Sequence, residues 1–121
     1  MNDAKLKQSF DLLKAALEEC RAEPGHPLKG AALAKAFETT FGYAWRAFRR
    51  EAGQAGLEAY SPRDALKSAA QLGIIEELED WNQFLNARNL SVHDYIGMDD
   101  PDMLDLVGRF RDEVGRLLEA G

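Results

Sequence analysis

The hydrophobic positions of this chain recur every three to four residues, which is the period of an α-helix with one buried face. The clearest case runs from about Ala4 to Arg21. Its apolar side chains are spaced four, three, four and three residues apart: Leu6, Phe10, Leu13, Leu17 and Cys20. No stretch has the two-residue alternation of a half-buried β-strand. The pattern therefore predicts an all-α fold.

Proline, glycine and capping residues divide this pattern into five helices. A second helix starts near residues 28–31 and ends at about Ala52, before Gly53 and Gly56. Ser61-Pro62-Arg63-Asp64 starts a short third helix, which ends at Leu72-Gly73. The fourth covers roughly Glu77 to Ser91 or beyond, and Asp99-Asp100-Pro101 opens the fifth. Residues 1–121 are therefore expected to form one domain, an antiparallel up-and-down four-helix bundle with one extra short helix packed across one end.

The net charge and the hydropathy of the chain limit the kinds of partner that it can bind. The net charge is −6, and residues 71–121 carry twelve Asp/Glu against four Lys/Arg. An acidic protein binds nucleic acid poorly without sequence preference, so any RNA would be met at a small local site or beside a more basic partner. The sequence lacks an apolar run long enough for a membrane span and a signal-peptide pattern at its start. We therefore expect a cytoplasmic protein that does not contact a membrane.

Four features of the sequence favour structural explanations over chemical ones. Arg46, Arg49 and Arg50 share one helix face, which favours a solvated basic face over a contact with phosphate or a partner. His26 has no carboxylate at ligand spacing, so neither a metal site nor a cofactor is expected. The acids of residues 99–102 lack the spacing of a cation loop and are interpreted as helix caps. The single cysteine, Cys20, follows the buried register of its helix and is interpreted as a small core residue.

The strongest chemical signal is Arg88-Asn89-Leu90-Ser91-Val92-His93-Asp94-Tyr95, at the end of the fourth helix. On an unbroken helix, six positions fall within an arc of roughly 100°: Trp81, Phe84, Leu85, Arg88, Val92 and Tyr95. Arg88 thus interrupts an apolar stripe, where a guanidinium is costly unless it is paired or faces a wet cleft. One interpretation is structural, with the cation at the carbonyl end of its helix; the other is a site for phosphate chemistry.

The same helix would place His93 about 140° from Arg88 but Tyr95 within about 20° of it. One chain presents Arg88 and His93 together only if the helix bends near Val92. A second copy related by a two-fold axis would also bring the two motifs face to face. In larger assemblies, an exposed edge of Trp81 or Trp45 would be the surface for further association.

Arg88-x4-His93-x-Tyr95 resembles the signature of HEPN-domain proteins, and more closely that of the branch named as nucleotidyltransferase substrate-binding subunits. The resemblance covers roughly residues 33–96. The other segments that carry it are Phe37 to Trp45, Ser61-Pro62-Arg63-Asp64, Gly73-Ile74-Ile75, Trp81 and Arg88-Asn89-Leu90-Ser91.

The resemblance implies a helical bundle that forms a homodimer or a higher even oligomer, with a minimal nucleotidyltransferase as its partner. It implies a HEPN toxin that is a metal-independent ribonuclease, in which Arg88 and His93 are catalytic. The partner, as antitoxin, would silence it by transferring AMP to Tyr95, and Asn89 matches the polar residue that follows the arginine. The alternative is a non-catalytic subunit that binds a nucleotide or substrate for the nucleotidyltransferase. A purely structural helical adaptor is a third possibility.

Overall fold

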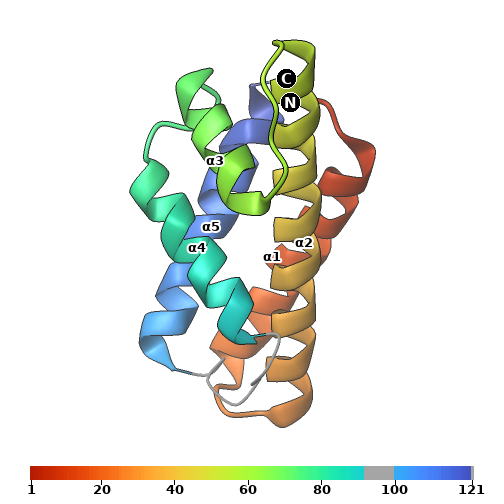
Figure 1. Ribbon diagram of the computed structural model, residues 1–121. Coiled ribbons are helices and arrows are strands. Elements are labelled where there is room, and N and C mark those ends of the chain that lie inside the picture. Colours follow the sequence, from red (N-terminus) through yellow and green to blue (C-terminus); the bar gives the residue numbers. More distant parts are fainter. Residues whose placement is uncertain (92–99, 121) are drawn as a thin grey trace.

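The computed structural model describes residues 1–91 and 100–120, and in these residues the chain is helical, without a β-strand. Figure 1 shows the helices in chain order. They are α1 (Ala4–Ala22), α2 (Pro27–Gln54), α3 (Pro62–Gln71), α4 (Leu78–Ser91) and α5 (Pro101–Glu119). All five helices expected from the hydrophobic pattern are present, and the all-α prediction is confirmed.

The helix starts follow the capping residues of the sequence. The side chain of Asp3 accepts a hydrogen bond from the Leu6 amide (3.0 Å), and Ser61 accepts one from the Asp64 amide (3.1 Å). Asp100 caps α5 in the same way, through the Asp102 amide (2.8 Å), so its role as a helix cap is confirmed. These acceptors satisfy amides of the first turn, which have no partner within the helix.

Four of the helices form an antiparallel ring, which Figure 1 shows from the side of α2 and α4. Each helix of the ring packs against two others, in the order α1, α2, α4, α5 and back to α1. The short α3 packs against α2 and α4, at the end of the bundle where α2 finishes. Gly73, with φ 76°, ends the turn after α3 in the left-handed conformation that glycine favours. The bundle with one extra short helix is therefore observed.

Aromatic rings from α2, α4 and α5 fill the centre of the bundle. Trp81 of α4 is 1% exposed, and its ring packs against Phe48 (5.2 Å), Phe84 (5.3 Å) and Phe110 (5.7 Å) between centroids. The expectation of an exposed Trp81 edge for association is therefore wrong, because the α2 and α5 phenylalanines surround the indole. Trp45 is half-buried against the core.

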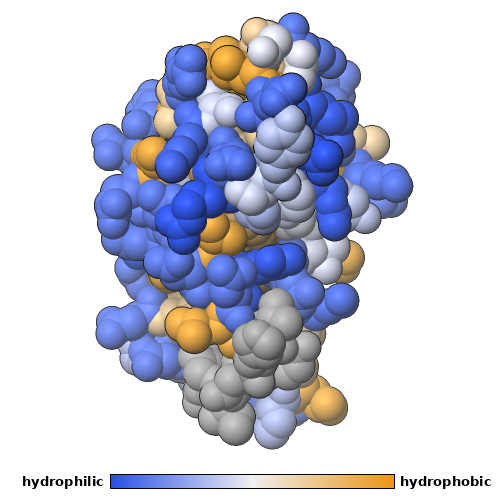
Figure 2. Space-filling view, viewed as in Figure 1, coloured by the Kyte–Doolittle hydropathy of each residue, from blue (hydrophilic) through white to orange (hydrophobic). Residues whose placement is uncertain are grey.

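Polar residues predominate on one face of the bundle. Figure 2 shows one face, over α2, α3 and α4, where hydrophilic residues surround small, separate hydrophobic patches. Among the described residues, no helix is both long and apolar enough to cross a membrane.

Cys20 is buried, and its thiol donates a hydrogen bond to the carbonyl oxygen of Lys29 (3.1 Å). The expectation that Cys20 is a core residue is therefore confirmed.

Candidate functional site

Arg88 lies in the last turn of α4, at the edge of the aromatic core. Phe84 and Leu85, one turn before it, are buried, and Arg88 itself is half-buried. Arg88 was predicted to interrupt an apolar stripe, and the described part of that stripe, before Arg88, is buried as expected. The Nη1 atom of Arg88 donates a hydrogen bond to the Oδ1 atom of Asn89 (3.3 Å), and the Nε atom of Arg88 is buried. A guanidinium whose stem is held by core packing keeps its fork of N–H donors in a restricted orientation, which suits carboxylate or phosphate binding.

The electrostatics of the helix end favour a positive charge at this position. The last carbonyl groups of an α-helix carry a partial negative charge, and Arg88 is the basic residue of the last turn of α4. Such a residue can stabilise the helix and bind an anion. The structural interpretation of Arg88 therefore remains compatible with the functional one.

The other two residues of the signature, His93 and Tyr95, lie outside the described residues. So do Val92 and Asp94. The structure thus brings Arg88 and Asn89 together, and the roles of all four candidate residues, including His93 and Tyr95, stay predictions.

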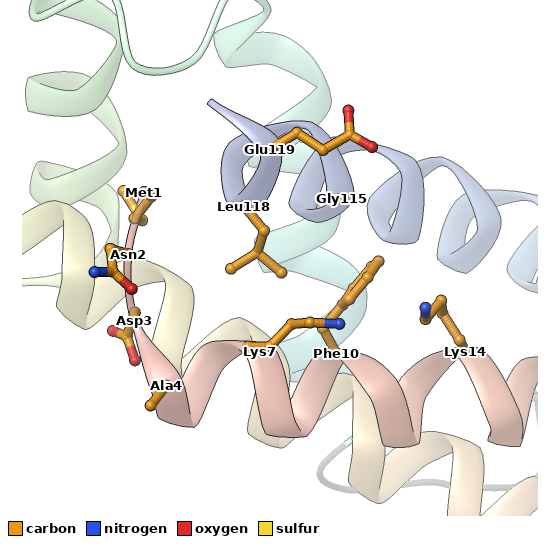
Figure 3. A pocket seen from close by; sticks show the side chains of 10 residues that line it. All are labelled: Met1, Asn2, Asp3, Ala4, Lys7, Phe10, Lys14, Gly115, Leu118 and Glu119. Carbon is orange, nitrogen blue, oxygen red and sulfur yellow. The ribbon is translucent and has the colours of Figure 1, made fainter. Parts of the chain in front are cut away.

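A second candidate region, not expected from the sequence, is a pocket of about 500 Å³ between the start of α1 and the end of α5. Figure 3 shows the Phe10 ring in this pocket between the side chains of Lys7 and Lys14, with Leu118 above them. The two ammonium groups lie 5.7 Å and 4.8 Å from the ring centroid. A signal for this pocket exists in the sequence, because two lysines seven residues apart flank a core aromatic residue on one helix face.

The two lysines of this pocket are already paired with a carboxylate. Asp11 accepts a hydrogen bond from Lys7 (2.8 Å) and lies 3.6 Å from the Lys14 ammonium group. The hydrogen bond from Lys7 lowers the pKa of the Asp11 carboxyl group below its ordinary value. The pocket is also distant from Arg88, because α5 runs antiparallel to α4 and the pocket lies at the far end of α5. It is therefore a weaker candidate for an anion site.

The remaining clusters have structural roles in the described part of the chain. Arg50 forms an ion pair with Asp3 (2.5 Å), and the Arg46 guanidinium lies 5.7 Å from the centre of the Trp45 ring. His26 caps α2, since its Nδ1 accepts hydrogen bonds from the amides of Leu28 (3.2 Å) and Lys29 (3.4 Å). Within residues 1–91 and 100–120, no group of three or more His, Cys, Asp or Glu side chains is placed to hold a metal ion.

Comparison with known proteins identifies the family. A crystal structure of a protein from Thermus thermophilus has a TM-score of 0.74 and 25% sequence identity, and the match covers 93% of this chain and 98% of that one. A search among curated proteins gives no significant match. The family described as "nucleotidyltransferase substrate binding protein like" matches residues 2–120. The match covers every helix of the bundle, and it agrees with the branch that the sequence motifs resemble. This chain therefore belongs to the nucleotidyltransferase substrate-binding protein-like family.

Proposed function

We propose that this chain is the nucleotide- or substrate-binding subunit of a nucleotidyltransferase complex in which a separate protein carries out the transfer. The observation that carries the proposal is the family match across residues 2–120. The acidic composition also favours a binding subunit, because an enzyme that cuts RNA needs affinity for a polyanion. In this function the chain presents its ligand to the partner and performs no bond cleavage itself.

In the proposed site, Arg88 binds a phosphate group of the ligand. Its guanidinium offers several N–H donors, and a charge-assisted hydrogen bond to phosphate is roughly twice as strong as a neutral one. Asn89 orients the guanidinium through the 3.3 Å contact between Oδ1 and Nη1. His93 and Tyr95 follow in the sequence and are proposed to complete the site with an imidazole and a phenol.

The proposed unit is a homodimer, which places two copies of the motif in one cleft. Two Arg88 side chains close to one another would be costly without an anion between them. That cost is removed when a phosphate binds, so the dimer would favour an anionic ligand. Sedimentation or light scattering with and without nucleotide tests this assembly, because the proposal requires a dimer at micromolar concentration.

Isothermal titration calorimetry with ATP and AMP tests the site directly, on the chain alone and after mixing with a minimal nucleotidyltransferase from the same organism. Arg88→Ala is expected to weaken binding by roughly 10- to 100-fold, since a hydrogen bond to a charged group contributes about 1.5–3 kcal/mol. Arg88→Lys keeps the charge but removes the fork, so an intermediate affinity is expected.

Arg63→Ala is the matched control, because Arg63 is an exposed arginine in the first turn of another helix, α3. It should bind nucleotide as the wild type does. Equal losses in the Arg63 and Arg88 variants would show that overall charge, and not a site, governs binding. Absence of nucleotide binding by the wild type in both settings would disprove the binding-subunit function.

A second candidate function is supported by the complete Arg88-x4-His93-x-Tyr95 signature in the sequence. It is a metal-independent ribonuclease toxin whose partner silences it by adenylylating Tyr95. His93 would exchange protons with the 2′-hydroxyl and the leaving oxygen, and Arg88 would hold the charge of the phosphorane, each step without a metal ion. Two assays distinguish it from the binding subunit. The toxin requires an AMP-sized mass gain after co-expression, absent in Tyr95→Phe, and RNA cleavage that His93→Ala abolishes.

A further inference from the structure

An apolar groove runs between α1 and α2 on the outside of the bundle, with a volume of about 310 Å³. Its walls are mostly small or aliphatic side chains, contributed by both helices. They are Ser9, Leu12 and Ala16 of α1, and Ala32, Lys35, Ala36 and Thr39 of α2. We call this the α1–α2 groove. Small residues on both walls leave room for another helix to approach closely, as at helix interfaces in general.

The exposure of Leu12 in this groove is unexpected for a chain without a partner. Its side chain is 68% exposed, although α1 buries Leu6, Leu13 and Leu17 completely on the neighbouring face. A large aliphatic residue beside a row of alanines forms a continuous apolar surface, and such surfaces on soluble proteins mark interaction sites. The groove therefore offers an apolar surface on which a partner could dock.

Three exposed cations lie along the groove, although the net charge of the chain is −6. Lys35 lines the groove, Lys5 lies seven residues before Leu12 on the same face of α1, and Arg46 lies seven residues after Thr39 on α2. All three are exposed, and none has an acidic partner within 4.0 Å in the part of the chain that the structure describes.

Two carboxylates near this face are already neutralised, because Glu19 and Glu23 both bind the Lys29 ammonium group (2.7 Å and 2.8 Å). Glu38, which adjoins Thr39 on α2, is half-buried. The groove thus presents an apolar floor beside uncompensated cations, and it complements a ligand that is apolar and acidic.

We propose that the α1–α2 groove is the docking site for an acidic amphipathic helix of the nucleotidyltransferase partner. This inference rests on the proposed function, because it assumes that such a partner exists. The helix would place its apolar stripe over Leu12, Ala32 and Ala36, and its carboxylates beside the uncompensated cations. This arrangement is a helix-in-groove contact, in which spaced apolar anchors supply affinity and charge pairs supply orientation and association rate.

Two other occupants fit less well. In a two-fold interface a surface meets its own copy, so a second chain would place Lys5, Lys35 and Arg46 near their equivalents, and like charges repel. A nucleic acid would need exposed hydrogen-bond donors or aromatic faces for its bases, and the groove wall is aliphatic. An acidic protein helix satisfies both the apolar and the charged part of the surface.

The groove is also separate from Arg88. It is formed by α1 and α2, whereas Arg88 lies on α4, which is diagonal to α1 in the ring. Docking of the partner and binding of nucleotide can therefore be measured independently in one set of variants.

The experiment measures binding of a purified minimal nucleotidyltransferase from the same organism to the full chain by titration calorimetry. Leu12→Asp should weaken this binding about tenfold or more, because truncation of an interface anchor typically has at least that effect. Lys35→Glu should weaken it less, and the association rate of the wild type should fall as salt is added. Tyr60→Asp is the control, since Tyr60 is 74% exposed and lies outside the groove, between α2 and α3.

Leu12 and Tyr60 are exposed, so both variants should fold, and circular dichroism with thermal melting verifies this. Unchanged partner affinity in folded Leu12→Asp overturns the docking inference alone. Loss of the homodimer in Leu12→Asp, measured by light scattering, also overturns it, because the occupant would then be a second copy. Failure of the wild type to bind the nucleotidyltransferase overturns both this inference and the proposed complex. Nucleotide binding by the chain alone should be equal in Leu12→Asp and wild type.

Discussion

Replacement of Trp81 by alanine should be among the most destabilising single changes in this protein. Its side chain is 1% exposed and packs against four phenylalanine rings, from α2, α4 and α5. Removal of a buried tryptophan typically costs about 3–5 kcal/mol, because burial is lost and a cavity remains. A domain of this size has a total stability of about 5–15 kcal/mol, so Trp81→Ala should remove roughly a fifth or more of it.

The sequence provides an internal control, since the protein contains two tryptophans. Trp45 is only half-buried at the edge of the core. Its replacement by alanine should therefore cost about 1–2 kcal/mol, because a smaller apolar area is exposed. Urea unfolding followed by circular dichroism gives both values. In Trp45→Phe, the remaining Trp81 should emit at short wavelength and shift to the red when the chain unfolds.

A loss of 1 kcal/mol in the free energy of unfolding lowers Tm by about 4 °C for a domain of this size. Trp81→Ala should therefore lower Tm by roughly 12–20 °C, and Trp45→Ala by roughly 4–8 °C. Equal costs at the two positions, or a cost below about 1 kcal/mol for Trp81, would contradict the assignment of Trp81 as the centre of the core.

Further predictions concern helix contacts, caps and charges. Gly108→Ala should stabilise α5 by about 0.5–1 kcal/mol in calorimetry, because its Cβ would meet only the flexible end of the Arg21 side chain (2.6 Å). Gly115→Ala should stabilise α5 less, because the new Cβ would lie 3.2 Å from the buried Phe10 ring. Ser61→Ala should cost about 1 kcal/mol in urea unfolding through loss of the α3 cap. The hydrogen bond from Lys29 lowers the pKa of Glu23. This hydrogen bond therefore stabilises the fold fully above the ordinary glutamate pKa. The stabilisation is lost as the pH falls through the lowered pKa of Glu23. NMR titration should show this lowered midpoint, and Lys29→Met should raise it.

The fold could be predicted from the sequence because local signals and the hydrophobic period agree. The caps at Ser61 and Asp100 are found where the sequence placed them, and the first three helices begin and end within a few residues of the expected positions. The period alone did not show that Trp81 is at the centre of the ring. Its surroundings depend on Phe48 of α2 and Phe110 of α5, which are distant in sequence.

The candidate site was predictable in part. Helical spacing predicted Arg88 on the apolar stripe of the fourth helix. The structure agrees for the described part of that stripe, because Trp81, Phe84 and Leu85 are buried and Arg88 is half-buried. The α1–α2 groove was not predicted, because Leu12 lies outside the row of buried apolar positions that the spacing of the first helix revealed. An exposed leucine is common on protein surfaces, and only its position beside the alanines of α2 gives it meaning.

The aromatic core and the candidate site are connected through α4. Trp81 and Phe84 anchor one face of this helix, and Arg88 extends that face to the end of the bundle. A mutation at Trp81 should therefore loosen α4 and displace the Arg88 guanidinium, even where the chain still folds. Trp81→Phe, which retains an aromatic ring and most of the volume, should weaken nucleotide binding less than Arg88→Ala does. A nucleotide affinity reduced more by Trp81→Phe than by Arg88→Ala would mean that α4 packing, and not the guanidinium, determines binding.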